Sequence, residues 1–147
     1  MDGSTNKSLS IANPSESNLT STVLDLDLRI LFLIAANPGA GTTTSALALA
    51  SQLAQMSSGQ VLLVDASQSA SNLTQQMNLS KERGLRDLLF NPDNPPLLQD
   101  CVVQISSLPF DVLPNGRPIR TMEHLTAERL SPLLDQLGSR YRFVVID

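Results

Sequence analysis

One stretch of the sequence, residues 29–65, limits the fold more than any other. Its first run, "RILFLIAA" (29–36), is continuously apolar after its first residue, which is typical of a strand buried on both faces of a parallel sheet. The turn "NPGAG" follows, an alanine-rich helix is predicted over 42–56, and "VLLVD" (61–65) predicts a second buried strand. These elements form one βαβ unit, whose crossover should be right-handed. The residues expected on the buried face of the helix are Leu47, Ala50, Leu53, Ala54 and Met56.

The next part of the chain, up to residue 100, is less regular. Residues 66–83 are polar, with Leu73, Met77 and Leu79 as the expected contacts with the core. A short helix is predicted over 84–90, and the turn-rich connector "NPDNPP" follows it.

The last third of the chain predicts three more strands and one helical region. The runs 101–105 and 110–114 are short strand candidates, and "YRFVVID" (141–147) is a last buried strand. A helical region is expected over 121–137; the residues expected to restart it and to end it are Ser131, Pro132 and Gly138. Strands that alternate with helices predict a doubly wound, mainly parallel α/β sheet of the Rossmann-like type.

Composition separates a tail from one domain and excludes several classes of function. Residues 1–22 have few large apolar side chains, so we expect a loose tail there and a domain over 23–147. A net charge of −4 without a basic cluster argues against nucleic-acid binding. No apolar run approaches the ~20 residues that span a bilayer, and the chain does not begin like a secretory signal. We therefore expect a cytoplasmic protein.

Two residues that often carry chemistry have ordinary interpretations here. Cys101 is the single cysteine, which excludes an internal disulfide and a cysteine metal cluster. It opens an apolar run, so we expect a small buried side chain rather than a nucleophile. His124 stands alone and is expected on a helix surface.

The turn after the first strand has most features of a phosphate-binding loop. Such a loop points backbone N–H groups and a helix N-terminus at the anion, while a lysine reaches the outer phosphates and a hydroxyl holds magnesium. Gly39 and Gly41 permit the close approach, and Thr43 supplies the hydroxyl. Thr42 stands in place of the lysine, and Ala36 stands where the strict pattern begins with glycine. The candidate binding residues are Pro38, Gly39, Ala40, Gly41, Thr42, Thr43 and Thr44.

The predicted topology brings two carboxylates to the same place. Ligands of open α/β sheets bind beyond the carboxyl ends of the parallel strands. Asp65 ends the second strand and Asp147 ends the last, so both are expected at the sheet edge that carries the loop.

Several segments, taken in order, resemble one family. "NPGAGTT", "LLVDAS", "GLRDLL", "LPNG" and "FVVID" follow one another as do the boxes of the bacterial tyrosine autokinases of capsule and exopolysaccharide synthesis, which are relatives of the Min and Par ATPases. The resemblance covers about residues 29–147. It implies a P-loop NTPase fold, ATP or ADP with Mg²⁺ as cofactors, and catalytic roles for Asp65 and Asp147. The implied magnesium ligands are Thr43, Asp65 and Asp147.

The chain departs from the family at three charged residues of the loop and the second box. Thr42 replaces the lysine of the loop, and Ser67 and Ser69 replace an aspartate and an arginine of the second box. Because phosphoryl transfer depends on electrostatic stabilisation of the phosphates, these changes predict a module that is not catalytic alone. Arg117 or Arg120, in the loop after "LPNG", remains a possible substitute cation.

Two other features of the family have no counterpart in this sequence. The upstream Glu-x-x-Arg-x-x-Arg helix used for ring assembly has no counterpart in residues 1–28, and Tyr141 is the only tyrosine, so a tyrosine-rich tail is missing. The sequence stops at the Walker B aspartate, Asp147, which suggests that the domain is incomplete and could be a fragment of a longer protein.

Three functions remain open. The first is a kinase-like pseudo-enzyme in exopolysaccharide synthesis or export, recruited to the inner membrane face by a membrane-embedded chain-length partner or an active paralogue. The second is an active tyrosine autokinase or ATPase that uses a substitute arginine, in cis or from a partner. The third is a Min- or Par-like positioning ATPase, which ranks last because Asn37 and its neighbours supply no signature lysine. A tight turn that merely caps a helix would also explain the loop by itself.

Overall fold

The protein forms one mostly parallel sheet with helices on both faces. The structure, a computed structural model, describes residues 16–37, 39–69, 71–91, 93–118 and 125–147. Within these residues the strand order is β1-β5-β2-β4-β3; all neighbours are parallel except β3 and β4. The strands are β1 (Ile30–Phe32), β2 (Val61–Val64), β3 (Val103–Gln104), β4 (Asp111–Leu113) and β5 (Phe143–Ile146).

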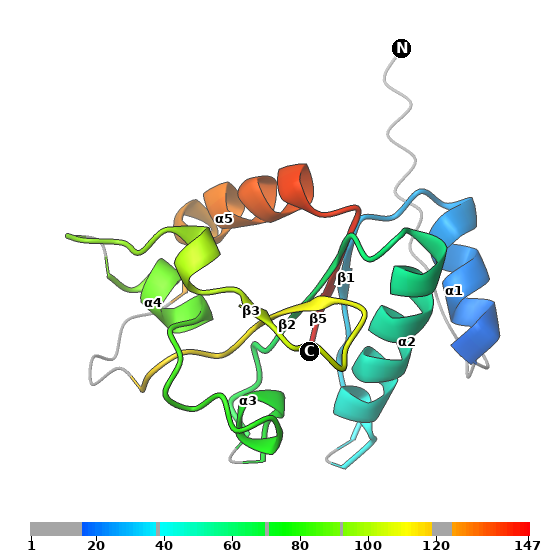
Figure 1. Ribbon diagram of the computed structural model, residues 1–147, viewed down its shortest axis with the longest axis horizontal. Coiled ribbons are helices and arrows are strands. Elements are labelled where there is room, and N and C mark those ends of the chain that lie inside the picture. The colour runs from blue at the N-terminus through cyan, green and yellow to red at the C-terminus, as the bar shows by residue number, and fades with distance from the viewer. Residues whose placement is uncertain (1–15, 38, 70, 92, 119–124) are drawn as a thin grey trace.

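The helices divide between the two faces of the sheet (Figure 1). One face is covered by α1 and α2, the other by α4 and α5, while α3 lies near one end of the strands. The prediction of a doubly wound α/β sheet is therefore confirmed. The helices are α1 (Glu16–Asp25), α2 (Thr42–Met56), α3 (Leu73–Gln76), α4 (Leu85–Leu89) and α5 (Ala127–Arg140), with a 3-10 turn at Leu98–Asp100.

Strands β2 and β5 form the centre of the core. Every residue of both strands is buried, and alternate side chains enter two different clusters. Leu63 and Val145 face α2, whereas Leu62 and Val144 face α5. Burial of each such side chain contributes about 1.5 to 3 kcal/mol, so these two strands contribute substantially to the stability of the fold.

Helix α2 packs closely on the sheet through small side chains. Its buried residues are Ala46, Leu49, Ala50, Leu53 and Ala54. The prediction is confirmed for Ala50, Leu53 and Ala54, whereas Ala46 and Leu49 were not predicted. Leu47 is only partly buried, and Met56, the last residue of the helix, is 60% exposed.

The chain before β1 contains a helix that the sequence analysis assigned to a loose tail. Residues 16–22 belong to α1, so the tail prediction is wrong for them; residues 1–15 lie outside the described residues. Val23 is fully buried against α2, and Thr20 donates a hydrogen bond to Gln52 Oε1. Leu19 and Leu24 pack against the same cluster while remaining partly buried.

Strand β1 is shorter and more exposed than predicted. Among the described residues it pairs with β5 alone, so its other edge is unpaired. Phe32 is 54% exposed and Ile34 is 87% exposed. The expectation of a strand buried on both faces is therefore wrong, because an apolar run does not reveal whether a strand is central or at an edge.

Helix α5 continues through two residues that were expected to interrupt it. Pro132 lies inside the helix and is exposed, while Gly138 precedes the last two residues of the helix rather than ending it. The helix persists because Leu133 and Leu137, four residues apart, are both buried on the sheet. The predicted start at residues 121–124, including His124, lies outside the described residues.

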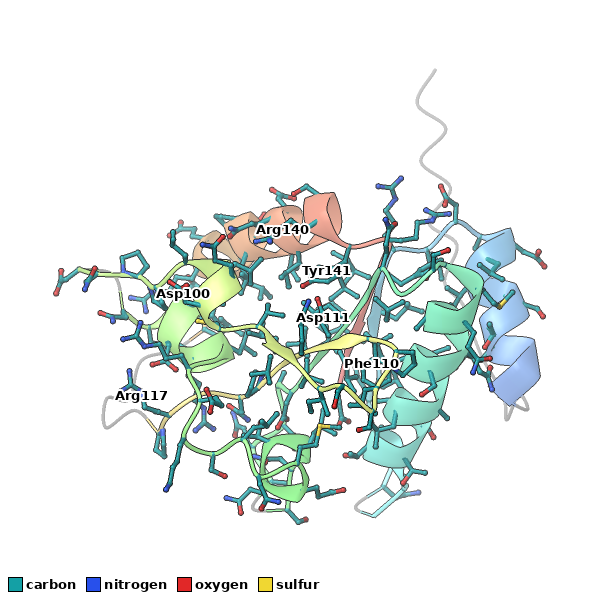
Figure 2. All side chains as sticks on the ribbon, in the orientation of Figure 1. Asp100, Phe110, Asp111, Arg117, Arg140 and Tyr141 are labelled. Carbon is teal, nitrogen blue, oxygen red and sulfur yellow. The ribbon has the colours of Figure 1, made fainter. Side chains whose placement is uncertain are left out.

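Two side chains with sequence-based interpretations have clear environments. Cys101 is 1% exposed, as predicted, and burial raises the pKa of its thiol to about 11, which keeps the thiol protonated and unreactive. The Tyr141 hydroxyl donates to Asp111 Oδ2 at 2.9 Å (Figure 2), and burial together with this hydrogen bond raises the pKa of Tyr141 well above its usual range. Tyr141 therefore has a structural role in the core.

The segments "GLRDLL" and "LPNG" pack directly on each other. The Leu85 amide donates to Pro114 O at 2.8 Å, and the Arg86 amide donates to Asn115 O at 2.9 Å. A Cβ on Gly84 would lie 2.1 Å from Pro114 O and 2.5 Å from Gly116 N. Glycine is thus required at residue 84 by the close approach of two backbones.

We predict that Gly84→Ala lowers the free energy of unfolding by about 2 to 3 kcal/mol, because the added methyl group meets backbone atoms that cannot move independently. Urea unfolding measures the change. The matched control is Gly138→Ala, where the nearest atom would be Ile30 Cδ1 at 3.8 Å. It should raise stability by about 0.5 to 1 kcal/mol, since alanine is the better helix former. Equal effects of the two changes would contradict the contact described at Gly84.

Candidate functional site

The candidate site begins where β1 ends and the chain turns into α2. Gly39 and Gly41 have φ values of 77° and 76°, which lie in the left-handed region that glycine adopts without strain. Gly41 is the N-cap of α2, and no side chain caps that end of the helix. The first amides of α2 are therefore directed at the space in front of the loop. Pro38 lies outside the described residues.

The parallel pairing of β5 brings Asp147 to this loop. The Asp147 amide donates to Val64 O at 2.9 Å, and the Asp147 carbonyl accepts from the Ala66 amide at 2.8 Å. The Thr43 hydroxyl donates to Asp147 Oδ2 at 2.7 Å, although the two residues are 104 positions apart. The structure thus brings together two of the predicted site residues.

A cavity of about 530 Å³ opens between the loop and the chain that follows β2. Six of the twelve lining residues carry hydroxyl groups, and within the part of the chain that the structure describes Asp147 is the only lining residue with an ionisable side chain. The lining residues are Ala35, Gly39, Ala40, Gly41, Thr42, Thr43, Thr44, Ser67, Ser69, Ser71, Gln76 and Asp147. The N-terminus of α2, which carries the equivalent of about half a positive charge, therefore faces the same cavity as the Asp147 carboxylate.

One wall of the cavity is built by three serines at alternate positions. The Ser69 amide donates to Ser67 Oγ at 3.1 Å, and the Ser71 amide donates to Ser69 Oγ at 3.3 Å. The sequence analysis treated Ser67 and Ser69 only as lost charges and did not identify Ser71 or Gln76. The three serines stand at alternate positions directly after a strand, and this pattern was a signal that one face of the segment lines the site.

Asp65 is not part of the cavity lining. It is fully buried, and its carboxylate accepts from the Ser67 amide at 3.1 Å, from the Thr74 amide at 2.8 Å and from the Thr74 hydroxyl at 2.5 Å. The structure therefore does not bring Asp65 together with Thr43 and Asp147. The strand end is where the sequence analysis expected it, but the side chain turns into the protein.

The oxygen ligands near the loop fit a magnesium ion only when further ligands are supplied. Mg²⁺ commonly keeps several waters and binds one or two carboxylates together with phosphate oxygens. Thr43 and Asp147 provide one hydroxyl and one carboxylate side by side. Nowhere in the described ranges do three or more His, Cys, Asp or Glu side chains gather into a metal-binding group.

The proposed substitute cation, Arg117, is directed elsewhere. Its guanidinium donates to Asp87 Oδ1 at 3.1 and 3.3 Å, and Arg117 is not among the residues that line the loop cavity. Figure 2 shows Arg117 on the α4 side of the molecule, away from α2. The Gly84 amide also donates to Asp87 Oδ2 at 2.9 Å, so Asp87 joins the two packed segments. Arg120 lies outside the described residues.

Solved structures with the same fold include bacterial kinase domains. The kinase domain of VpsO matches with a TM-score of 0.74 and 30% identity, over 90% of this chain and 65% of that one. The kinase domain of the Escherichia coli tyrosine kinase ETK matches with a TM-score of 0.73 and 26% identity, over 89% of this chain and 50% of that one. The predicted resemblance to bacterial tyrosine kinases is therefore confirmed.

The structural similarity also includes a P-loop ATPase that is not a tyrosine kinase. A ParA family ATPase from Chlorobium tepidum TLS matches with a TM-score of 0.60 and 28% identity, over 81% of this chain and 50% of that one. The chain thus has the fold of P-loop ATPases and spans between half and two thirds of the length of these structures. No protein-family model and no curated protein matches it.

We predict that Arg117→Ala changes the free energy of unfolding by less than about 1 kcal/mol, because its side chain is 57% exposed and exposed ion pairs contribute little. Asp87→Ala should cost about 1 to 3 kcal/mol, since it removes the acceptor for the Gly84 amide as well. Thermal and urea unfolding of the two variants give the comparison. A larger loss for Arg117→Ala than for Asp87→Ala would contradict the assigned roles.

Proposed function

We propose that this chain is a kinase-like P-loop module of exopolysaccharide or capsule biosynthesis whose nucleotide binding is impaired. The observation that carries the proposal is the loop cavity, where the only ionisable lining residue among the described residues is the carboxylate Asp147. The loop has the backbone for phosphate binding, but Thr42 offers a neutral hydroxyl at the position of the family's lysine.

The missing charge has a substantial energetic effect. A hydrogen bond to a charged group contributes about 1.5 to 3 kcal/mol, compared with about 1 kcal/mol for a neutral pair. The helix N-terminus adds only about 0.3 to 1 kcal/mol for an anion at its end. The helix terminus therefore offsets only part of the loss, and Asp147 repels phosphate unless a metal ion lies between them.

The remaining residues retain partial roles in this proposal. Thr43 and Asp147 would hold Mg²⁺, which supplies charge neutralisation at phosphate oxygens. The amides at the start of α2 would contact the phosphates, and Thr42 and Thr44 would donate neutral hydrogen bonds. Positioning is thus preserved better than electrostatic stabilisation, which is the larger part of phosphoryl-transfer catalysis.

The proposed partners are a membrane-embedded chain-length or export protein, or an active paralogue. No helix of the described residues is long and apolar enough to cross a membrane. In this proposal such a partner recruits the module to the inner membrane face. In this role the module acts by binding, and its partner recognises the surface of the folded domain.

The alternative functions receive less support. An active kinase or ATPase would need a cation from Arg120, which lies outside the described residues, or from a partner, because Arg117 is paired with Asp87 outside the loop cavity. A Par-like positioning ATPase is favoured less, because the ParA family structure matches with a TM-score of 0.60 and the VpsO kinase domain with 0.74.

The test is calorimetric titration with Mg-ATP of the wild type, Thr42→Lys and Thr42→Met. Lysine and methionine have similar length, so the pair isolates the charge. We predict that Thr42→Lys binds about 10- to 100-fold more tightly than the other two, which corresponds to one charge-assisted hydrogen bond. Circular dichroism of all three proteins controls for folding.

Each outcome of this titration is informative. Wild-type binding as tight as that of Thr42→Lys would contradict impaired binding and favour the active kinase or ATPase. Equal tightening by Thr42→Met would show that side-chain size, rather than charge, limits the site.

A further inference from the structure

Behind the serine wall lies a closed ring of hydrogen bonds. Asp65 accepts from the Ser67 amide through Oδ1 at 3.1 Å and from the Thr74 hydroxyl through Oδ2 at 2.5 Å. Thr74 Oγ1 accepts in turn from the Asn115 amide at 2.8 Å. The Asn115 side-chain amide donates to Ser67 O, which closes the ring.

Three of the four members of this ring are unusually well buried for polar residues, and the fourth, Ser67, is half-buried at the cavity. Asp65 is 0% exposed, Thr74 is 3% exposed and Asn115 is 4% exposed. Among the described residues, no buried side-chain nitrogen or oxygen lacks a hydrogen-bond partner. A fully satisfied network in a region of low dielectric constant holds its members firmly, because breaking one bond exposes a polar group to an apolar environment.

The ring joins three segments at one wall of the cavity. Asp65 ends the run that begins with β2, Thr74 lies in α3, and Asn115 follows β4. Ser67, which lines the cavity, is held through both its amide and its carbonyl. Its position in turn orients the next serine, whose amide donates to Ser67 Oγ.

We propose that Asp65 is a positioning residue that fixes the serine wall of the cavity and does not hold the metal ion. Both carboxylate oxygens already accept hydrogen bonds, and Thr74 occupies Oδ2 with two donors. Because Asp65 is 0% exposed, a metal ion could reach this carboxylate only by disturbing the buried network, either at Oδ1 beside the Ser67 amide or at Oδ2 in place of Thr74. Asp147, in contrast, lies at the cavity beside Thr43.

The first test is amide hydrogen exchange of the full chain, followed by NMR. Thr74→Val keeps the shape of the side chain and removes the hydroxyl, whereas Thr74→Ser keeps the hydroxyl. Thr74→Val should speed exchange of the Ser67 and Asn115 amides by about tenfold or more, and Thr74→Ser should restore wild-type rates. Asp65→Asn should act like Thr74→Val, and the double variant should add little beyond either change.

Unchanged exchange at Ser67 and Asn115 in Thr74→Val would overturn the proposal. This readout requires no ligand, and the Thr74 pair still decides the question if Asp65→Asn does not fold. It therefore remains valid even if the proposed nucleotide-related function fails.

A second readout rests on the proposed function and separates positioning from metal binding. In the Thr42→Lys protein, Mn²⁺ binding in the presence of ADP is measured by electron paramagnetic resonance. Asp65→Asn and Thr74→Val should weaken it by similar small factors, and Thr74→Ser should not. A loss of Mn²⁺ binding in Asp65→Asn alone, with normal exchange at Ser67, would assign Asp65 to the metal and overturn the proposal.

Discussion

The parallel pairing of β5 with both β1 and β2 is the interaction on which the rest of the structure depends. It aligns the carboxyl ends of three strands, so the loop after β1, Asp147 after β5 and the serine segment after β2 surround one cavity. Every residue of β5 is buried, and its side chains enter both core clusters. The geometry of the site therefore depends on apolar burial in the centre of the sheet rather than on any charge that a ligand would contact.

This separation explains how the fold can persist while its chemistry changes. No cation is needed for α2 to pack on the sheet, because alanine and leucine side chains make that contact. The residue at position 42 affects what the loop binds more than whether it forms. The chain shares its fold with kinase domains and a ParA family ATPase, yet its loop cavity is lined by hydroxyl groups and one carboxylate. The fold therefore does not by itself determine what the loop binds.

The sequence predicted the parts that depend on local pattern. The helix over 42–56, the strand that precedes Asp65 and the anchor Leu73 follow from periodicity and continuous apolar runs, and all three are present. The exposure of β1, the continuation of α5 through Pro132 and the inward direction of Asp65 depend on tertiary partners. Helix α1 was missed because the side chains that pack it, Leu19, Thr20, Val23 and Leu24, lie among Ser, Thr and Asn residues that are typical of a tail. The ring through Asn115 joins residues 48 positions apart, which no local pattern reveals.

The central claim is that the wild-type loop is correctly shaped but lacks the charge needed for tight nucleotide binding. The most direct measurement is an NMR titration of the wild-type chain with Mg-ATP that follows the amides of residues 39–44 and Asp147. The account predicts well-dispersed signals with shifts that do not saturate below about 1 mM, because only the helix terminus and a shared metal ion attract the phosphates. Saturation of these signals at micromolar Mg-ATP would contradict it.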